Sequence, residues 1–246
     1  MSVFKYIIAF IFFLNSFQSK SQVAISEIDF DKIPQKKVRE YLIFQQNSID
    51  LLSEIEPSLK TYSSTEDYKK YTKDYFVKGS LQQVWNHYIY TNPVEAWDGK
   101  KVTVGLLYSN KDDKLVYTGE RVAHLDTGQV VYLNLKFIKG VLNLATVIEF
   151  ITIDQQNHIV EYSYIKGNKT EGKQRMEFFE DSKGRTCILH SSYFKSDSAI
   201  RDRFFYPFFH NKFSNEFHRN MRKRFIKKLQ IAESNNQTKT NPISTL

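Results

Sequence analysis

The chain has 246 residues, of which 41% are hydrophobic and 15% aromatic, so it holds enough apolar material for a packed core, and wholesale disorder is excluded. Nine Gly and five Pro exclude a collagen-like or low-complexity chain, and no apolar run approaches the roughly 20 residues of a bilayer span, which excludes a multi-pass membrane protein. The net charge is +8, and the single cysteine, Cys187, rules out an intramolecular disulfide and a four-cysteine zinc site.

Residues 1–21 have the pattern of a secretory signal peptide. Lys5 supplies the positive start, an apolar run follows from Tyr6 to Leu14, and Ser19-Lys20-Ser21 fits a small-x-small cleavage site. The apolar run has nine residues, about half of a membrane span, which favours a cleaved signal over a membrane anchor. We therefore expect a periplasmic or secreted protein whose mature chain begins near Gln22.

The segment 22–67 carries one predicted helix. Between Pro34 and Ile55, apolar residues lie three, four or seven positions apart, which is the spacing of one helical face, and Pro57 ends the pattern. We expect this amphipathic helix to pack on the body of the protein. Docking of the same helix on a partner protein is the alternative.

From residue 68 the hydrophobic pattern changes to that of strands, separated by short turns rich in Gly, Asn and Asp. The predicted strands are Tyr68–Lys78, Lys101–Tyr108, Lys114–Thr118, Gln129–Phe137, Thr146–Asp154, Ile159–Lys166, Arg175–Glu180 and Arg185–Phe194. Short connections between successive strands predict an antiparallel meander.

The run Gln129–Phe137 shows the alternation most clearly. Its odd-numbered residues predict a face toward the core, and its even-numbered residues predict a face mostly toward water. The odd set is Val131, Leu133, Leu135 and Phe137, and the even set is Val130, Tyr132, Asn134 and Lys136.

Two helices are expected among these strands. Ser80 is a good N-cap for a short helix that Asn92-Pro93 ends. A longer helix closes the domain, because apolar and mostly aromatic residues recur every four positions from Phe205 to Leu229. Four residues advance a helix by about 40° beyond a full turn, so this stripe spirals, and a strongly curved sheet is needed to cover it.

The order of elements resembles the START/Bet v 1-like (SRPBCC, polyketide cyclase) superfamily. The local matches are Gly79-Ser80-Leu81-Gln82-Gln83-Val84-Trp85-Asn86, in which a polar helix start precedes a Val-Trp pair, and the loop aromatic of Trp97-Asp98. The resemblance covers about residues 68–230. It implies an α+β helix-grip fold, in which a curved antiparallel sheet wraps a long C-terminal helix. A lipocalin is the rival, but its signature Trp belongs on the first strand, whereas Trp85 lies in a helical pattern.

The chain is therefore expected to have four parts: a signal peptide at 1–21, an N-terminal helical extension at 22–67, a helix-grip domain at 68–232 and a disordered polar tail at 233–246. The resemblance implies a hydrophobic cavity between the sheet and the C-terminal helix. It carries over no catalytic residue, because the superfamily has no universal one. We expect non-covalent binding of an apolar, lipid-like molecule rather than catalysis. The candidate lining residues are Trp97, Leu133, Leu135, Phe137, Tyr162, Tyr164, Phe205, Phe209 and Phe213.

Side chains that carry chemistry are scattered. The six histidines lack the spacing of a zincin helix, so we expect no metal site, and no motif indicates a cofactor. His210 and His218 are separated by about 12 Å along one helix, too far to share an ion directly, and we expect them at the surface or in capping roles. Cys187 lies in an apolar strand, where we expect an inert thiol.

Two other functional classes stay open. A cyclase or dehydratase acting on an apolar substrate would need a titratable group such as His190 or Glu149 inside the cavity. A protein without a ligand, whose N-terminal helix docks on a partner, would have an interior filled by its own side chains.

Positive charge is concentrated near the C-terminus. The segment Arg201–Lys228 has nine Lys and Arg against two Asp and Glu, a net charge of +7. A solvated helix face explains this pattern, and an anionic membrane surface is the partner that such a face would attract, with the basic end turning the cavity mouth toward lipid. We expect no nucleic acid partner, because an exported protein seldom meets one.

Overall fold

The computed structural model describes residues 22–137, 140–198, 202–203 and 206–240, with side chains placed through residue 235, so the expected signal peptide lies outside the described residues. The helical elements are η1 (Ile25–Glu27), η2 (Phe30–Lys32), α2 (Lys36–Gln45), η3 (Leu52–Glu54), α3 (Leu81–Tyr90), α4 (Pro93–Trp97) and α5 (Tyr206–Thr240). The strands are β1 (Lys69–Val77), β2 (Val102–Ser109), β3 (Lys114–Tyr117), β4 (Gln129–Phe137), β5 (Leu142–Asp154), β6 (Ile159–Tyr164), β7 (Thr170–Glu180) and β8 (Thr186–Ser196).

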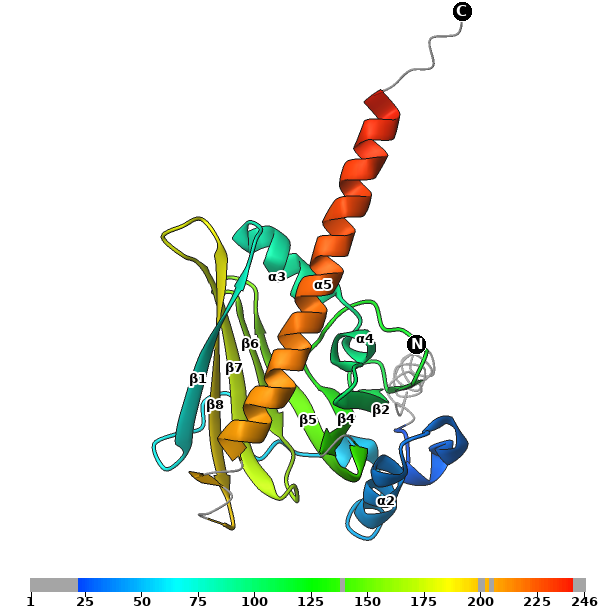
Figure 1. Cartoon of the computed structure of the whole chain (residues 1–246). Helices are drawn as coiled ribbons and strands as arrows, with labels where there is room; N and C mark the ends of the chain where they lie inside the picture. The colour runs from blue at the N-terminus through cyan, green and yellow to red at the C-terminus, as the bar shows by residue number, and fades with distance from the viewer. Residues whose placement is uncertain (1–21, 138–139, 199–201, 204–205, 241–246) are drawn as a thin grey trace, which may run out of the picture.

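All eight strands form one antiparallel sheet in the order β1-β8-β7-β6-β5-β4-β2-β3. The run β4 to β8 is the meander predicted from the turns, and β1 pairs with β8 to form one edge of the sheet. Irregularities of register between Val104 and Leu106 in β2, and between Phe150 and Thr152 in β5, increase the local bend. The sheet curves around α5 (Figure 1), so the topology is the α+β helix-grip fold expected from the sequence.

The first two helices of the domain begin at well-formed caps. Ser80 and Gln83 make a capping box at the start of α3, as the sequence predicts for Ser80. α3 ends at Tyr90 with Thr91 as its C-cap. Asn92 begins α4, because its side chain accepts a hydrogen bond from the Val94 N–H (3.2 Å), with Pro93 in the first turn. The short helix α4 brings Trp97 under α5.

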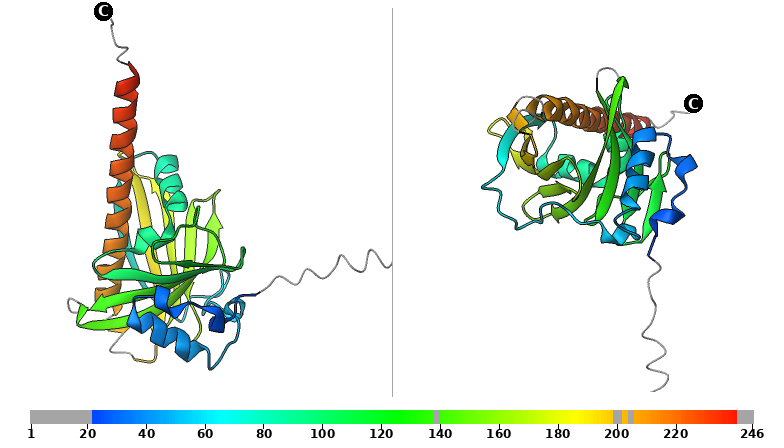
Figure 2. Two further views of the ribbon diagram at one scale, coloured as in Figure 1. Left: turned by 90° about the vertical axis from the view of Figure 1, so that its right-hand side faces the viewer. Right: turned by 90° about the horizontal axis from the view of Figure 1, so that it is seen from below.

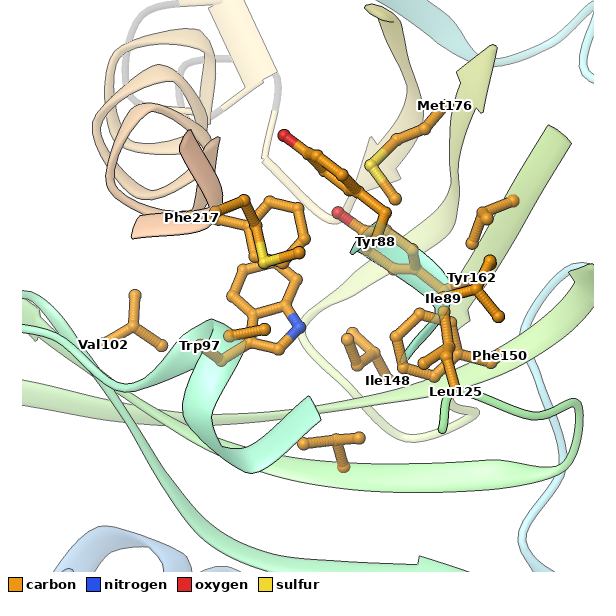
Figure 3. Close-up of a cluster of buried hydrophobic side chains, with 14 of the residues drawn as sticks. Tyr88, Ile89, Trp97, Val102, Leu125, Ile148, Phe150, Tyr162, Met176 and Phe217 are labelled. Atoms are coloured by element: carbon orange, nitrogen blue, oxygen red, sulfur yellow. The ribbon is translucent and has the colours of Figure 1, made fainter. Parts of the chain in front are cut away.

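The aromatic stripe of α5 is held by the sheet, as expected. Phe213, Phe217, Met221 and Phe225 are at most 7% exposed and belong to the same core cluster as the inward residues of the strands. Trp97 stacks on Phe217 with ring centroids 4.4 Å apart, and Figure 3 shows the two rings one above the other. The helix itself continues through Thr240, so it extends into the segment that was expected to be disordered, and its end projects past the sheet (Figure 1).

The extension 22–67 covers the outer face of the sheet, so α2 and α5 lie on opposite sides of it (Figure 2). α2 is shorter than expected, because it ends at Gln45 and a separate turn, η3, follows. Val38 of α2 is fully buried, and it approaches β2 at Gly105, where a Cβ atom would lie 2.9 Å from the Val38 side chain. The predicted packing of this helix on the body is confirmed.

The outer layer corrects the prediction for β4. Val130, Tyr132 and Asn134 were expected to face mostly water, yet they are 2%, 0% and 5% exposed. The alternation of the strand is as predicted, but the extension buries the second face as well. Tyr132 donates a hydrogen bond to the Gln45 side chain of α2 (2.9 Å), which satisfies its hydroxyl under that layer.

Candidate functional site

A cavity of about 930 Å³ lies between the first half of α5 and strands β4 to β7. This volume is at the upper end of the range of about 300–1,000 Å³ that is usual for small-molecule sites. Exposed apolar side chains, among them Phe44 of α2 and Leu142 of β5 at 62% and 56% exposure, lie at its rim. The alternative of a protein without a ligand required an interior filled by the protein's own side chains. The cavity shows that the interior is not filled in this way.

The structure places most of the predicted lining residues on this cavity. Those that line it are Trp97, Leu133, Leu135, Phe137, Tyr162, Tyr164, Phe209 and Phe213. Phe205 lies outside the described residues. Alternation on β4 and β6 and the four-residue period of α5 aim these side chains at one space. That they contact a ligand stays a prediction.

A cluster of uncharged polar side chains occupies one wall of the cavity. Gln174 of β7, 2% exposed, donates from Nε2 to Ser192 Oγ (2.8 Å) and to the Tyr206 hydroxyl (2.9 Å). The hydroxyls of Tyr164 and Tyr206 are 2.8 Å apart, and Gln174 Oε1 is 2.7 Å from Nε2 of His210. Gln174, Tyr164, Tyr206 and His210 all line the cavity, so this wall can hold a polar group of a ligand.

A second polar chain runs behind the wall. The hydroxyl of Tyr162, which lines the cavity, is 3.3 Å from Nε2 of His190. Nδ1 of His190 is 2.9 Å from Nε2 of His218, and Nδ1 of His218 is 3.1 Å from the Tyr88 hydroxyl. Four side chains from α3, β6, β8 and α5 are therefore connected in one hydrogen-bonded row inside the core.

Burial keeps these groups uncharged. Desolvation lowers the pKa of His210 to about 4 and that of His218 to about 3, and it lowers the pKa of His190 well below its ordinary value. The same burial raises the pKa of the Tyr162 and Tyr206 phenols well above the ordinary value. At neutral pH the histidines are neutral imidazoles and the tyrosines keep their protons.

One expectation about titratable residues is wrong, and one requirement of the enzyme alternative is not met. His210 and His218 are neither at the surface nor capping groups, because the curved sheet encloses the face of α5 that carries them. His190 and Glu149, the candidates for an acid or base inside the cavity, do not line it. His190 sits behind Tyr162, whereas β5 alternates so that Glu149 shares the outer face with Val147, under the extension.

The polar wall was missed, although the sequence contains a signal for it. Tyr206, His210, Ser214 and His218 recur every four residues, each directly following a position of the Phe stripe. Such a row follows the aromatic stripe around α5, and residues four apart lie on the same side of a helix. The partners Gln174 and Ser192 come from β7 and β8, and no local pattern links them to α5.

Cys187 is buried in β8, and burial raises the pKa of its thiol, as expected for an unreactive cysteine. Among the described residues, no group of three or more His, Cys, Asp and Glu side chains is arranged to hold a metal ion. Within the same residues, no helix combines the length and the apolar character that crossing a membrane requires.

The basic part of α5 is not positioned to turn the cavity mouth toward a lipid surface, contrary to the expectation from the sequence. The cavity touches α5 at Tyr206–Ser214, whereas the exposed cations Arg222, Lys223 and Lys227 lie at least eight residues further on, about 12 Å along the helix. Figure 1 shows this part of α5 leading toward the end of the sheet opposite α2. If these residues contacted an anionic surface, the cavity mouth would therefore point away from that surface.

The fold defines a helix-grip protein with an internal cavity. Solved structures similar to it include a point mutant of norcoclaurine synthase from Thalictrum flavum, at 12% identity and a TM-score of 0.48, covering 65% of this chain and 95% of that one. Ginseng major latex-like protein 151 from Panax ginseng, at 13% identity and a TM-score of 0.47, matches 64% of this chain and 97% of that one. Similarity of this degree concerns the fold alone. No protein-family model matches the chain, and the search of curated proteins found no match.

Proposed function

We propose that the protein binds one apolar, lipid-like molecule in the cavity between α5 and the sheet. The observation that carries the proposal is the cavity itself: about 930 Å³ of unfilled space walled by aromatic and aliphatic side chains. Apolar cavities of this size favour binding because a ligand replaces exposed apolar surface with contacts. Along one side the Phe137 ring meets the rings of Phe209 and Phe213 edge to face, with centroids 4.5 Å and 5.2 Å apart, so this wall is preformed.

Binding without chemistry is the better-supported role for the same cavity. The catalytic alternative required an acid or base of suitable pKa in contact with the ligand, and the imidazole that lines the cavity, His210, has its pKa lowered to about 4. A group with so low a pKa is a weak base at neutral pH. The wall is suited to holding a polar group rather than to transferring its proton.

The proposed place of action is outside the cytoplasm. Support comes from the signal-like pattern of residues 1–21, with Lys5 before the apolar run Tyr6–Leu14. An anionic membrane surface is the proposed partner of the basic part of α5. Arg222, Lys223 and Lys227 are exposed there, and the exposed Ile226 (47%) and Ile231 (53%) accompany them.

Native mass spectrometry of the protein purified from its own host tests the binding proposal. We expect an additional mass from a bound molecule that disappears on denaturation. The Leu135→Trp variant should lose this bound molecule, because the indole ring is larger than the leucine side chain and occupies part of the cavity. Ile231→Trp, a change of the same kind on the exposed part of α5, should keep the ligand. A protein without extra mass that also fails to take up apolar probes would overturn the proposal.

A further inference from the structure

We infer that the polar wall selects, among apolar molecules, those that carry an uncharged oxygen group, such as a hydroxyl or a carbonyl. The inference rests on the proposed function, because it concerns the ligand of the same cavity. It is carried by two separate hydrogen-bonded networks, each of which ends at a phenol that lines the cavity: Tyr164 in one and Tyr162 in the other.

The first network has one hydroxyl proton more than its internal contacts can use. Gln174 Nε2 lies 2.8 Å from Ser192 Oγ, 2.9 Å from the Tyr206 hydroxyl and 3.3 Å from the Tyr164 hydroxyl, to each of which it can donate. The Tyr206 hydroxyl lies 2.8 Å from that of Tyr164 and 2.9 Å from that of Ser192. If Ser192 donates to Tyr206 and Tyr206 donates to Tyr164, the proton of Tyr164 is free for a ligand. If the direction reverses, the oxygen of Tyr164 can accept from Gln174 and still keeps one lone pair for a ligand hydroxyl.

The second network has the same property. A neutral imidazole carries one N–H, so the row Tyr162–His190–His218–Tyr88 has two consistent directions. In one, Tyr162 donates to His190; in the other, His190 donates to Tyr162, and the phenol proton is free to point into the cavity. Tyr162 and Tyr164 belong to the same strand, β6, two positions apart, so their side chains leave it on the same face.

The lack of charge on the polar wall disfavours ionised head groups. Among the described lining residues there is no Asp, Glu or Arg, and the one cation is Lys169, in the connection before β7. Lys73 of β1 donates from Nζ to the Asn211 side chain of α5 (2.6 Å), and its charge is, after burial, a secondary cause of the lowered pKa of His210. The side chains that form the polar wall are all uncharged: Gln174, Tyr164, Tyr206 and His210. Moving a carboxylate or an ammonium group to that wall would therefore strip it of water without a charged partner in the wall itself. An uncharged oxygen pays a much smaller desolvation cost and gains a hydrogen bond.

Matched probes separate this inference from the proposed function. The probes are naphthalene, 2-naphthol, 2-acetonaphthone and 2-naphthoate, which share one ring system and differ in the head group. Binding at neutral pH is followed by calorimetry on the wild type and on Tyr164→Phe and Tyr162→Phe. Tyr62→Phe is the control, because that side chain is 98% exposed.

We expect 2-naphthol and 2-acetonaphthone to bind the wild type about 3- to 10-fold more tightly than naphthalene, which corresponds to one net hydrogen bond. We expect 2-naphthoate to bind more weakly than either. Each cavity variant should lose most of this gain while it keeps its affinity for naphthalene, and the control should change nothing. Retained naphthalene affinity also shows that a variant has folded with its cavity intact.

The outcomes are distinguishable. Equal affinities for naphthalene and 2-naphthol, or tighter binding of 2-naphthoate, would overturn the selection of an uncharged oxygen group and leave apolar binding standing. A wild-type protein that binds none of the four probes would overturn both. A gain for 2-naphthol that survives in both Tyr164→Phe and Tyr162→Phe would show that the polar wall is not its source.

Discussion

His190 of β8 and His218 of α5 are hydrogen-bonded to each other in the core, with 2.9 Å between Nδ1 of the first and Nε2 of the second. Both residues are nearly inaccessible, at 1% and 4% exposure, and neither has a carboxylate partner among the residues that the structure describes. This hydrogen bond joins the sheet to the C-terminal helix α5, and burial keeps both imidazoles neutral.

This pair predicts that the protein loses stability in mild acid. In the unfolded chain the histidines take up protons near their ordinary pKa of 6.5, whereas in the folded protein the pKa of His218 is about 3 and that of His210 about 4. Between these values the unfolded state binds more protons, so the free energy of unfolding falls as the pH falls, by up to about 1.4 kcal/mol per pH unit for each histidine. Urea unfolding from about pH 7 to about pH 4.5 measures the effect.

The comparison variant for this prediction is His218→Gln. We expect it to be less stable than the wild type at neutral pH, because the hydrogen bonds to His190 and Tyr88 are altered, and to lose less stability on acidification. Tyr62→Phe is the control, since that side chain is 98% exposed, and it should leave the pH dependence unchanged. A pH dependence in His218→Gln as steep as that of the wild type would contradict the assignment.

Glu149 carries the opposite pH dependence. One of its carboxyl oxygens is buried without a hydrogen-bond partner, and burial, followed by repulsion from Glu56, raises its pKa to about 7. The unfolded chain releases this proton near the ordinary pKa of 4.5, so the free energy of unfolding falls as the pH rises from about 4.5 to about 7, and the full cost of the ionised carboxyl is present above neutral pH. We expect Glu149→Gln to stabilise the protein by about 1–2 kcal/mol near pH 8 and by little near pH 5.

Urea unfolding of Glu149→Gln beside Glu171→Gln, an exposed glutamate of β7, measures that difference. If Glu149→Gln stabilised the protein equally at both pH values, the destabilising effect of Glu149 would not come from its charge.

Glu216 of α5 fastens the helix to the loop before β2. Its carboxylate, 2% exposed, accepts hydrogen bonds from the backbone N–H groups of Lys100 (3.1 Å), Lys101 (2.7 Å) and Val102 (3.0 Å). Glu216→Ala leaves these donors without an acceptor, and we expect a loss of about 2–4 kcal/mol in thermal or urea unfolding. Glu233→Ala, on the exposed end of α5, should change stability by less than about 0.5 kcal/mol. Equal effects of the two changes would exclude this fastening role.

The basic part of α5 predicts salt-sensitive binding to anionic vesicles. Each exposed cation near such a surface contributes about 1 kcal/mol, so replacing Arg222, Lys223 and Lys227 by Gln should weaken vesicle binding about 100-fold. The matched control replaces Lys69, Lys78 and Lys183, exposed lysines of the β1 and β8 side of the sheet, and should bind as the wild type does. Cosedimentation at low and high salt measures both. A wild type that ignores anionic vesicles at low salt ends the membrane proposal.

Periodicity in the sequence was enough to predict the sheet and the gripped helix, whereas the family resemblance implied the cavity and alternation then selected most of its lining residues. The four-residue repeat from Phe213 to Phe225 requires a curved cover, and the alternation of Leu133, Leu135 and Phe137 identifies the inner face of β4. These signals are local: a side chain's direction follows from the geometry of its own helix or strand. The boundaries of α2 and the true end of α5 were less well predicted, because packing with distant segments sets them.

What covers each face, and what meets inside, was decided by the tertiary structure alone. Tyr132 is buried because the extension lies over it, and Gln174 meets His210 because β7 and α5 approach each other in space. Burial, hydrogen-bond partners and the resulting pKa values depend on atoms far away in the chain, which no local period encodes. The sequence by itself therefore determined the fold and the apolar lining, and only the folded chain united its tyrosines and histidines into a polar wall.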